Sequence, residues 1–375
     1  MVFGAGAFAG LAAEVERLGM RRALVLSTPG QRRLADEVAR RAGERVAGIF
    51  AGAVMHVPVD TVLAARAAAE AVGADGCIAI GGGSTIGLGK ALALEAAALA
   101  VAAGEAAPGS SGSVTAAERG RPSGALATLA IPTTFSGSEM TPVFGVTARG
   151  QKRTGRDERV LPRAVIYDPE LLATLPVKVA GPSGVNGIAH CVEALYARDR
   201  NPITSLMAEE GIRALVASLP RVVADDSDRE ARAEARGEAL YGAWLAGSCL
   251  AATSMALHHK LCHLLGGRYD LPHAETHTVL LPHVVQYNRD FAVEAMARLG
   301  RALGGADPAV GLFDLAQRLH APLALRQLGL PESALDEAAD LAMMGTYDNP
   351  RPLERSGIRQ LLQAAWQGTR PGGAA

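Results

Sequence analysis

The stretch Gly76-Cys-Ile-Ala-Ile80 runs directly into Gly81-Gly-Gly-Ser-Thr-Ile-Gly-Leu-Gly-Lys90, and this junction decides the fold. Its first part is a short apolar run, as in a buried strand of a parallel sheet. Glycines at a strand-to-helix turn let the backbone approach a phosphate closely, and the N-terminus of the following helix offers unpaired amides. The stretch therefore predicts a strand, a phosphate-binding turn and a helix.

The turn matches neither of two common nucleotide-binding sequences. A P-loop needs glycine at the position of Ser84 and Ser or Thr at Ala91, and the usual dinucleotide fingerprint needs glycine at Ile86. The alternative is a glycine-rich turn that only packs tightly. The residues favour phosphate binding and leave the ligand undecided.

Strands and helices alternate around this turn, which is typical of an α/β domain with a parallel sheet. A second polar turn, Pro132-Thr-Thr-Phe-Ser-Gly-Ser-Glu-Met-Thr-Pro142, is placed to face a ligand held by the first, unless its hydroxyls only cap a helix. Further strands are expected at Arg22–Ser27, Val46–Ala51, Ala125–Ile131 and Arg163–Asp168, helices at Gln31–Ala42 and Asp60–Val72, and a basic turn at Arg149–Arg159.

The second half of the chain has helical periodicity and few apolar runs of strand length. We expect an α/β domain over residues 1–178, with a flexible insertion at 107–124, and an all-helical domain over 179–375. Within the latter, Ala239–Leu265 is expected to form one long apolar helix.

Composition excludes several classes of function. The 37 basic and 38 acidic residues give a net charge of −1, so we expect neither nucleic acid nor an anionic membrane as a partner. The four cysteines lack CxxC spacing, which argues against a disulfide framework and favours a reducing cytoplasm. The N-terminus lacks the pattern of a signal peptide.

Six of the nine histidines fall between His258 and His283, which suggests proton transfer or metal binding. Asn186, His190 and Glu193 lie close to one face of a predicted helix. A core imidazole or a helix cap is the alternative for each histidine taken singly.

Together these segments resemble the iron-containing alcohol dehydrogenase family, from about residue 20 to 366. The likeness rests on Gly81–Lys90, Pro132–Pro142, Lys152 sixteen residues before Asp168, Asn186-Gly-Ile-Ala-His190, and His263 with His277. Two segments, His258-His-Lys-Leu-Cys-His263 and Tyr347-Asp-Asn-Pro-Arg-Pro352, resemble the maleylacetate reductases of this family.

The resemblance implies a dehydroquinate synthase-like fold, a homodimer, and an active site in the cleft between an NAD(P)H-binding domain and a helical domain. The cofactor-binding residues that it implies are Thr28, Gly82, Gly83, Ser84, Thr133, Thr134, Phe135, Ser138, Thr141 and Lys152. Arg32 and Arg33 near Thr28, where NAD-preferring relatives often have Asp, suggest that NADH and NADPH both serve.

The resemblance also aligns Asn186, His190, His263 and His277 with the positions that bind iron or zinc in metal-dependent relatives. An amide is a weaker ligand for a divalent cation than the carboxylate expected there, so we expect no metal requirement. Without a metal, these histidines are expected to share a proton and form a cationic patch for an anionic substrate.

The implied reaction is the reduction of maleylacetate to 3-oxoadipate in aromatic compound catabolism. Hydride addition to the alkene produces an enolate that a donor must stabilise and protonate. The expected catalytic residues are His190, His259, His263, His277 and Asn186, with Lys260, Arg268 or Arg351 pairing with a substrate carboxylate.

Three other functions are compatible with parts of this pattern. A metal-dependent dehydrogenase of a small alcohol or polyol would use Asn186 as a ligand. A dehydroquinate-synthase-like lyase would need more charged residues for a phosphorylated substrate than the helical domain offers. A non-catalytic nucleotide-binding protein would leave the histidine cluster unexplained.

Overall fold

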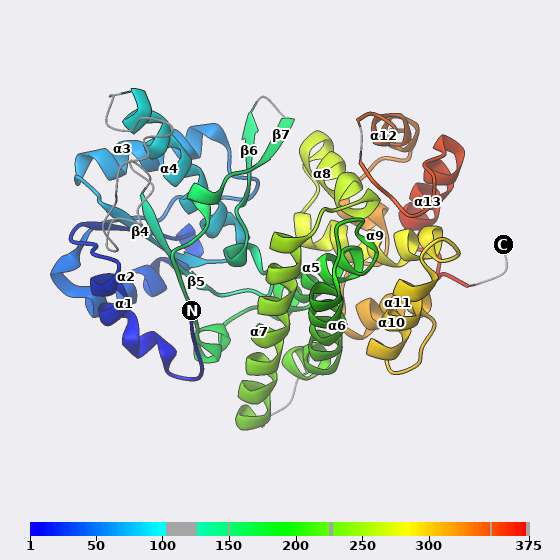
Figure 1. The fold of residues 1–375 in the computed structure, drawn as a ribbon, viewed down its shortest axis with the longest axis horizontal. Helices are drawn as coiled ribbons and strands as arrows, with labels where there is room; N and C mark the ends of the chain where they lie inside the picture. Colours follow the sequence, from blue (N-terminus) through cyan, green and yellow to red (C-terminus); the bar gives the residue numbers. More distant parts are fainter. Residues whose placement is uncertain (103–125, 149–150, 225–227, 346, 373–375) are drawn as a thin grey trace. The chain divides into compact units, whose positions relative to one another are not determined.

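The computed structural model describes residues 1–102, 126–148, 151–224, 228–345 and 347–372 (Figure 1). The expected insertion at 107–124 lies outside these residues. The chain forms two compact units. The first comprises Met1–Thr133, Ser138–Arg149 and Arg153–Asp168, and the second comprises Thr134–Gly137, Gly150–Lys152 and Pro169–Ala375. The main chain passes from one unit to the other between Asp168 and Pro169, and the division expected at residue 178 stays a prediction.

The first unit is built on a six-stranded sheet in the order β1-β8-β5-β4-β2-β3, with every pair parallel. Because β2 is followed by β3 on one side and β4 lies on its other side, the strand order reverses between β2 and β4. Ligands of open parallel sheets bind at such a reversal, outside the carboxyl ends of the strands. The strands are β1 Val2–Phe3, β2 Ala23–Leu26, β3 Val46–Phe50, β4 Gly76–Gly81, β5 Ala127–Pro132 and β8 Ala164–Tyr167.

Helices connect these strands and bury their apolar side chains. The helices are α1 Leu11–Arg17, α2 Arg32–Ala42, α3 Val59–Ala71 and α4 Gly83–Ala102. The fold class and the strands and helices predicted around the glycine turn are confirmed. The basic turn expected at Arg149–Arg159 is wrong in part, because Gln151–Arg156 forms β7, which pairs with β6 (Val143–Ala148) in a two-stranded sheet.

The described part of the second unit is almost entirely helical (Figure 1). Helix α5 (Val177–Tyr196) is buried at every position from Ala180 to Tyr196, so other elements pack around it on all sides. The remaining helices are α6 Pro202–Val223, α7 Arg229–Ala252, α8 Leu257–Tyr269, α9 His273–Asn288, α10 Val293–Ala302, α11 Pro308–Arg318, α12 Ala334–Ala342 and α13 Arg355–Gln367.

The single long helix expected at Ala239–Leu265 is wrong. Helix α7 ends at Ala252 and α8 begins at Leu257, and the two helices are bent by 97° at this break. No single described helix is long and apolar enough to span a membrane. The bent pair α7 and α8 together would be, by length and composition only. Helix α8 ends at Tyr269 and is capped by Asp270, which has the left-handed conformation (φ 55°). Pro272 then precedes α9.

Candidate active site

The glycine turn of the first unit lies at the carboxyl ends of adjacent strands. Gly81 of β4 is paired in register with Pro132 of β5, and the Thr133 amide donates to the Gly81 carbonyl over 3.0 Å. The Gln31 side-chain amide, just after β2, donates to Oγ1 of Thr133 over 2.8 Å. Three strand ends thus meet where the strand order reverses, the usual place for a nucleotide.

Gly81 is required by the backbone at this turn. Its φ is +152°, and a Cβ atom there would lie 2.4 Å from Oγ1 of Thr85. Helix α4 begins two residues later at Gly83, so its first amides follow the turn directly. A strand end, a glycine turn and a helix N-terminus form an anion-binding arrangement.

Some of the predicted cofactor residues lie together in the first unit, and others belong to the second unit. Thr28, Gly82, Gly83, Ser84 and Thr133 all lie at the strand ends just described. Thr134 and Phe135 belong to the second unit, where the Phe135 amide donates to Oγ of Ser183 over 3.3 Å. Lys152 lies in β7, and its side chain is outside what the structure describes.

Ser138 and Thr141 are held by Lys90, the last residue of the glycine stretch. The Lys90 ammonium is fully buried and donates to the Ser138 carbonyl (2.6 Å), to Oγ1 of Thr141 (3.1 Å) and to the Val143 carbonyl (2.8 Å). Burial lowers the pKa of Lys90 to about 7, opposed by the charge of Glu139. Lys90 therefore anchors the polar turn, a role that its sequence position did not reveal.

In the second unit, one histidine pair is tied to a carboxylate. Nδ1 of His190 on α5 lies 2.8 Å from Nε2 of His259 on α8. Nδ1 of His259 lies 2.7 Å from Oε2 of Glu193, one turn after His190 on α5. All three side chains are at most 5% exposed. A carboxylate, an imidazole and a second imidazole thus form one hydrogen-bonded line.

A second histidine pair lies beside the first. Nε2 of His258 is 2.9 Å from Nδ1 of His277 on α9, and Sγ of Cys262 is 3.7 Å from the same His258 nitrogen. The ring centroids of His259 and His277 are 4.9 Å apart. The two pairs therefore form one buried cluster that joins α5, α8 and α9.

His263, another of the expected residues, lies near the first pair. His263 is half-buried, and its ring is 6.1 Å from that of His259 and stacks on His273 at 6.0 Å. Buried atoms of these residues without a hydrogen-bond partner among the described residues include Oδ1 of Asn186, Nδ1 of His258 and Nε2 of His277. These atoms retain the capacity to bind a ligand.

Burial controls the protonation of the cluster. It lowers the pKa of His190 and His277 well below the usual range and that of His258 to about 3, with neighbouring histidine charges adding to the effect. The cationic patch expected from the sequence is therefore wrong for His190 and His277 in the free protein, because desolvation penalises the charged form. They are neutral at pH 7.

The three predicted substrate-binding cations have different surroundings. Arg268 forms an ion pair with Glu337 at 2.8 Å on the surface, with its side chain 60% exposed. Arg351 stacks over the ring of Tyr287 at 4.3 Å, and the ammonium of Lys260 lies 5.9 Å from the ring centroid of Tyr347. Their roles toward a substrate stay predictions.

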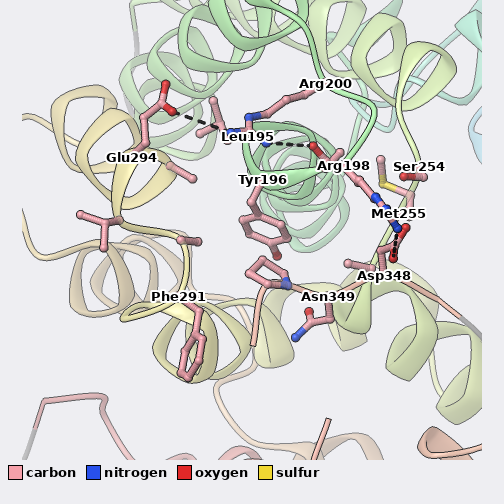
Figure 2. Close-up of a pocket in the computed structure, with 16 residues that line it drawn as sticks. Leu195, Tyr196, Arg198, Arg200, Ser254, Met255, Phe291, Glu294, Asp348 and Asn349 are labelled. Atoms are coloured by element: carbon pink, nitrogen blue, oxygen red, sulfur yellow. Dashed lines mark hydrogen bonds and ion pairs between the residues drawn. The ribbon is translucent and has the colours of Figure 1, made fainter. Parts of the chain in front are cut away.

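A separate pocket of about 490 Å³ lies within the second unit. The ring of Tyr196 stands among its lining residues (Figure 2). They come from the end of α5, the break before α8, the start of α10 and the segment Asp348–Pro350. Tyr196 and Ala256 line the pocket and also hydrogen-bond to Glu193. None of the predicted site residues lines it.

Comparison with known proteins extends these observations to the whole chain. The iron-containing alcohol dehydrogenase model matches residues 1–169, and the C-terminal model of the same family matches residues 181–366. The chain belongs to the iron-containing alcohol dehydrogenase family. It is therefore an oxidoreductase that uses a nicotinamide cofactor.

Within this family the chain is similar to maleylacetate reductases. It is 51% identical to that of Burkholderia cepacia and 50% identical to that of Sphingobium indicum, each over 99% of this chain and 96% of the relative. A solved maleylacetate reductase from Agrobacterium tumefaciens superposes with a TM-score of 0.84 at 47% identity, covering 99% of this chain and 96% of that one.

The residues that the resemblance aligns with the family's metal ligands do not form one group of candidate ligands among the described residues. Among the described residues, the group of three His, Cys, Asp or Glu ligand atoms within 4.8 Å of one another is His258, Cys262 and His277, which shares one member with the family positions. Nδ1 of His190 is bonded to His259, and Asn186 offers a neutral amide. We derive no step through a metal.

Two members of the cluster were not among the residues predicted from sequence. Glu193 shares a helix face with His190, a spacing visible in the sequence, but its partner His259 lies 66 residues away. His258 was visible as part of the cluster, and only the packing of α8 against α9 shows that it pairs with His277.

Proposed function

We propose that the chain reduces the carbon–carbon double bond of maleylacetate to give 3-oxoadipate, with NADH or NADPH as the hydride donor and without a metal. The observation that carries the proposal is the 51% identity to a maleylacetate reductase over 99% of this chain. A buried imidazole cluster with an amide at the family's acidic position supports it. We further propose that the enzyme is a cytoplasmic homodimer acting in aromatic compound catabolism.

The chemistry requires a hydride donor and a proton donor. Hydride from the nicotinamide forms a C–H bond at the alkene carbon distant from the ketone, and the π electrons move to form an enolate on the ketone oxygen. A proton then adds to the carbon beside the ketone, so NAD(P)H and one proton are consumed per substrate. An oriented donor stabilises the enolate, because charge develops there in the transition state.

Neutral imidazoles are suitable donors for this reaction. A neutral imidazole N–H stabilises the enolate by a hydrogen bond, as in enzymes that use a neutral histidine as an electrophile. His277 contributes Nε2, which has no partner among the described residues, and Asn186, one turn before His190 on α5, contributes a side-chain amide. His190, His259 and His263 complete the proposed catalytic group, and Lys260, Arg268 or Arg351 pairs with a substrate carboxylate.

The nucleotide half of the reaction is assigned to the glycine turn of the first unit and to the other residues predicted to bind the cofactor. We propose that the amides of Gly82, Gly83 and Ser84 hold the pyrophosphate, as expected at a glycine turn before a helix. Thr28 and Thr133 would contact the adenosine side, and Thr134, Phe135, Ser138, Thr141 and Lys152 the remainder of the cofactor.

The proposal is tested with purified protein, with and without chelator, assayed with NADH and NADPH against maleylacetate and against simple aldehydes. We expect reduction of maleylacetate that chelator does not diminish. Activity restricted to aldehydes and abolished by chelation would instead support the metal-dependent dehydrogenase that the comparisons do not favour.

A further inference from the structure

Glu193 is a fully buried carboxylate with all of its strong hydrogen bonds inside the second unit. Its Oε2 accepts from the Ala256 amide over 2.8 Å and lies 2.7 Å from Nδ1 of His259. Its Oε1 accepts from the His258 amide over 2.8 Å. Glu193 is 0% exposed, and a charge buried in this way persists only where such partners satisfy it.

These contacts decide the tautomer of His259. Burial by itself would raise the pKa of Glu193, but the hydrogen bond and charge of His259 outweigh it, so the pKa is lowered and the carboxylate is ionised. An ionised carboxylate only accepts hydrogen bonds, so Nδ1 of His259 carries the hydrogen. Nε2 of His259 is consequently the atom presented to Nδ1 of His190.

We propose that Glu193 is a positioning residue for the reduction: it fixes the tautomer and orientation of His259 and, through His259, the ring of His190. The inference rests on the proposed function, since it assigns Glu193 a part in the same reaction. Glu193 is not one of the positions that the resemblance aligns with the family's metal ligands.

The neighbouring histidine pair gives a contrast within the same cluster. His258 and His277 are joined at 2.9 Å, but the outer nitrogen of each ring, Nδ1 of His258 and Nε2 of His277, has no partner in the part of the chain that the structure describes. In that pair either tautomer forms the same single hydrogen bond. The line from Glu193 fixes one arrangement, and such outer partners orient a reactive imidazole.

A purely structural role for Glu193 is the competing explanation. Its bonds to the Ala256 and His258 amides satisfy donors at the start of α8, which is ordinary helix capping. Asp199 provides a matched case, because it accepts from the Ser254 amide over 3.0 Å at the same break between α7 and α8 and contacts no histidine in the described structure. Loss of the Asp199 carboxylate weakens the connection between α7 and α8 but leaves the hydrogen bonds from Glu193 through His259 to His190 intact.

The decisive experiment compares Glu193→Gln with Asp199→Asn in steady-state reduction of maleylacetate. Glutamine keeps the shape and one acceptor oxygen but no longer fixes the tautomer of His259. We expect kcat to fall by about 10² to 10⁴-fold with little change in KM, as wrong-tautomer substitutions do elsewhere. Asp199→Asn is expected to retain wild-type kcat.

Isotope effects separate positioning from loosening. In Glu193→Gln the proton step should become slower, so the effect of deuterated NADH should shrink toward unity while the solvent deuterium effect grows. His259→Gln, which leaves the Glu193 caps of α8 in place, should show the same pattern even if Glu193→Gln fails to fold.

Two results would overturn the proposal. One is wild-type kcat in folded Glu193→Gln or in His259→Gln. The other is an equal loss in Asp199→Asn and Glu193→Gln with unchanged isotope effects, which would identify a structural role. Failure of the proposed function is distinguishable, because the unmodified enzyme would then not oxidise NADH or NADPH with maleylacetate.

Discussion

Nε2 of His258 lies 2.9 Å from Nδ1 of His277, so the first turn of α8 is joined to the second turn of α9 through two fully buried imidazoles. Because Nδ1 of His277 is occupied by this bond, Nε2 is the nitrogen left to meet a ligand. Replacement of His277 is therefore the most direct test of the proposed role of the histidines in the reaction.

Replacing His277 with Asn is expected to lower kcat for maleylacetate by about 10² to 10⁴-fold, the usual contribution of a positioned proton donor or acceptor. Asparagine keeps a polar side chain, but it is too short both to bond to His258, as Nδ1 does, and to meet a ligand, as Nε2 does. The matched control is His283→Gln on the same helix, which should retain activity. Comparable activity in His277→Asn and the unmodified enzyme would exclude His277 from the reaction.

Asn186→Asp is expected to increase bound metal. A carboxylate at this position supplies the anionic ligand that the cluster lacks, and divalent cations prefer an anionic donor over an amide. Metal content is measured by mass spectrometry after exposure to iron or zinc and dialysis, so the readout does not depend on activity. Asn201→Asp is the control, because aspartate caps α6 as well as asparagine does. Equal metal content in both variants would contradict the prediction.

Cofactor preference should respond to residues at the end of β2. Thr28 follows this strand, and Arg33 lies exposed in the first turn of α2. We expect Arg33→Ala, alone or with Arg32→Ala, to lower kcat/KM for NADPH by about 10-fold and to spare NADH, because a charged hydrogen bond contributes about 1.5–3 kcal/mol. Thr28→Asp should act in the same direction by repelling the 2′-phosphate.

The control for cofactor preference is Arg21→Ala, an exposed arginine that precedes β2 and so lies at its amino end. Arg21→Ala should leave kcat/KM unchanged for both NADPH and NADH. If Arg33→Ala leaves the ratio of NADPH to NADH activity unaltered, these arginines do not contact the 2′-phosphate.

Most of the α/β unit could be predicted because glycines and apolar runs punctuate its strands. Strand β4 was expected at Gly76–Ile80 and extends to Gly81. Strand β7 was missed, since its charged sequence becomes a strand only through pairing with β6. The break between α7 and α8 was missed because apolar residues continue on both sides of it without a proline or glycine.

The histidine cluster could be located from sequence, but its protonation could not. Spacing placed His190 and Glu193 on one face of a helix, whereas the bond from Glu193 to His259 depends on how α8 packs against α5. The pKa values of these histidines follow from burial, which no local sequence pattern reports. The cationic patch was expected for that reason, whereas burial lowers the pKa of His190 and His277 and so favours their neutral forms.

Acid should destabilise the fold through its buried histidines, and His283 provides a measurable share. Burial lowers the pKa of His283 to about 4, against about 6.5 in an unfolded chain. As the pH falls below 6.5, His283 is protonated in the unfolded chain. In the folded protein it stays neutral until about pH 4. The free energy of unfolding therefore decreases across this window, by about 3 kcal/mol for His283.

His283→Gln removes this term, so between pH 7.5 and 4.5 the variant should lose about 2–3 kcal/mol less unfolding free energy than the unmodified protein. Urea unfolding at the two pH values measures the difference. His320→Asn is the control, since His320 is exposed and asparagine tolerates its positive φ of 53°. Because the comparison is between slopes, any packing cost of the glutamine cancels. Parallel slopes for His283→Gln and the unmodified protein would mean that His283 is protonated in the folded state at mildly acidic pH.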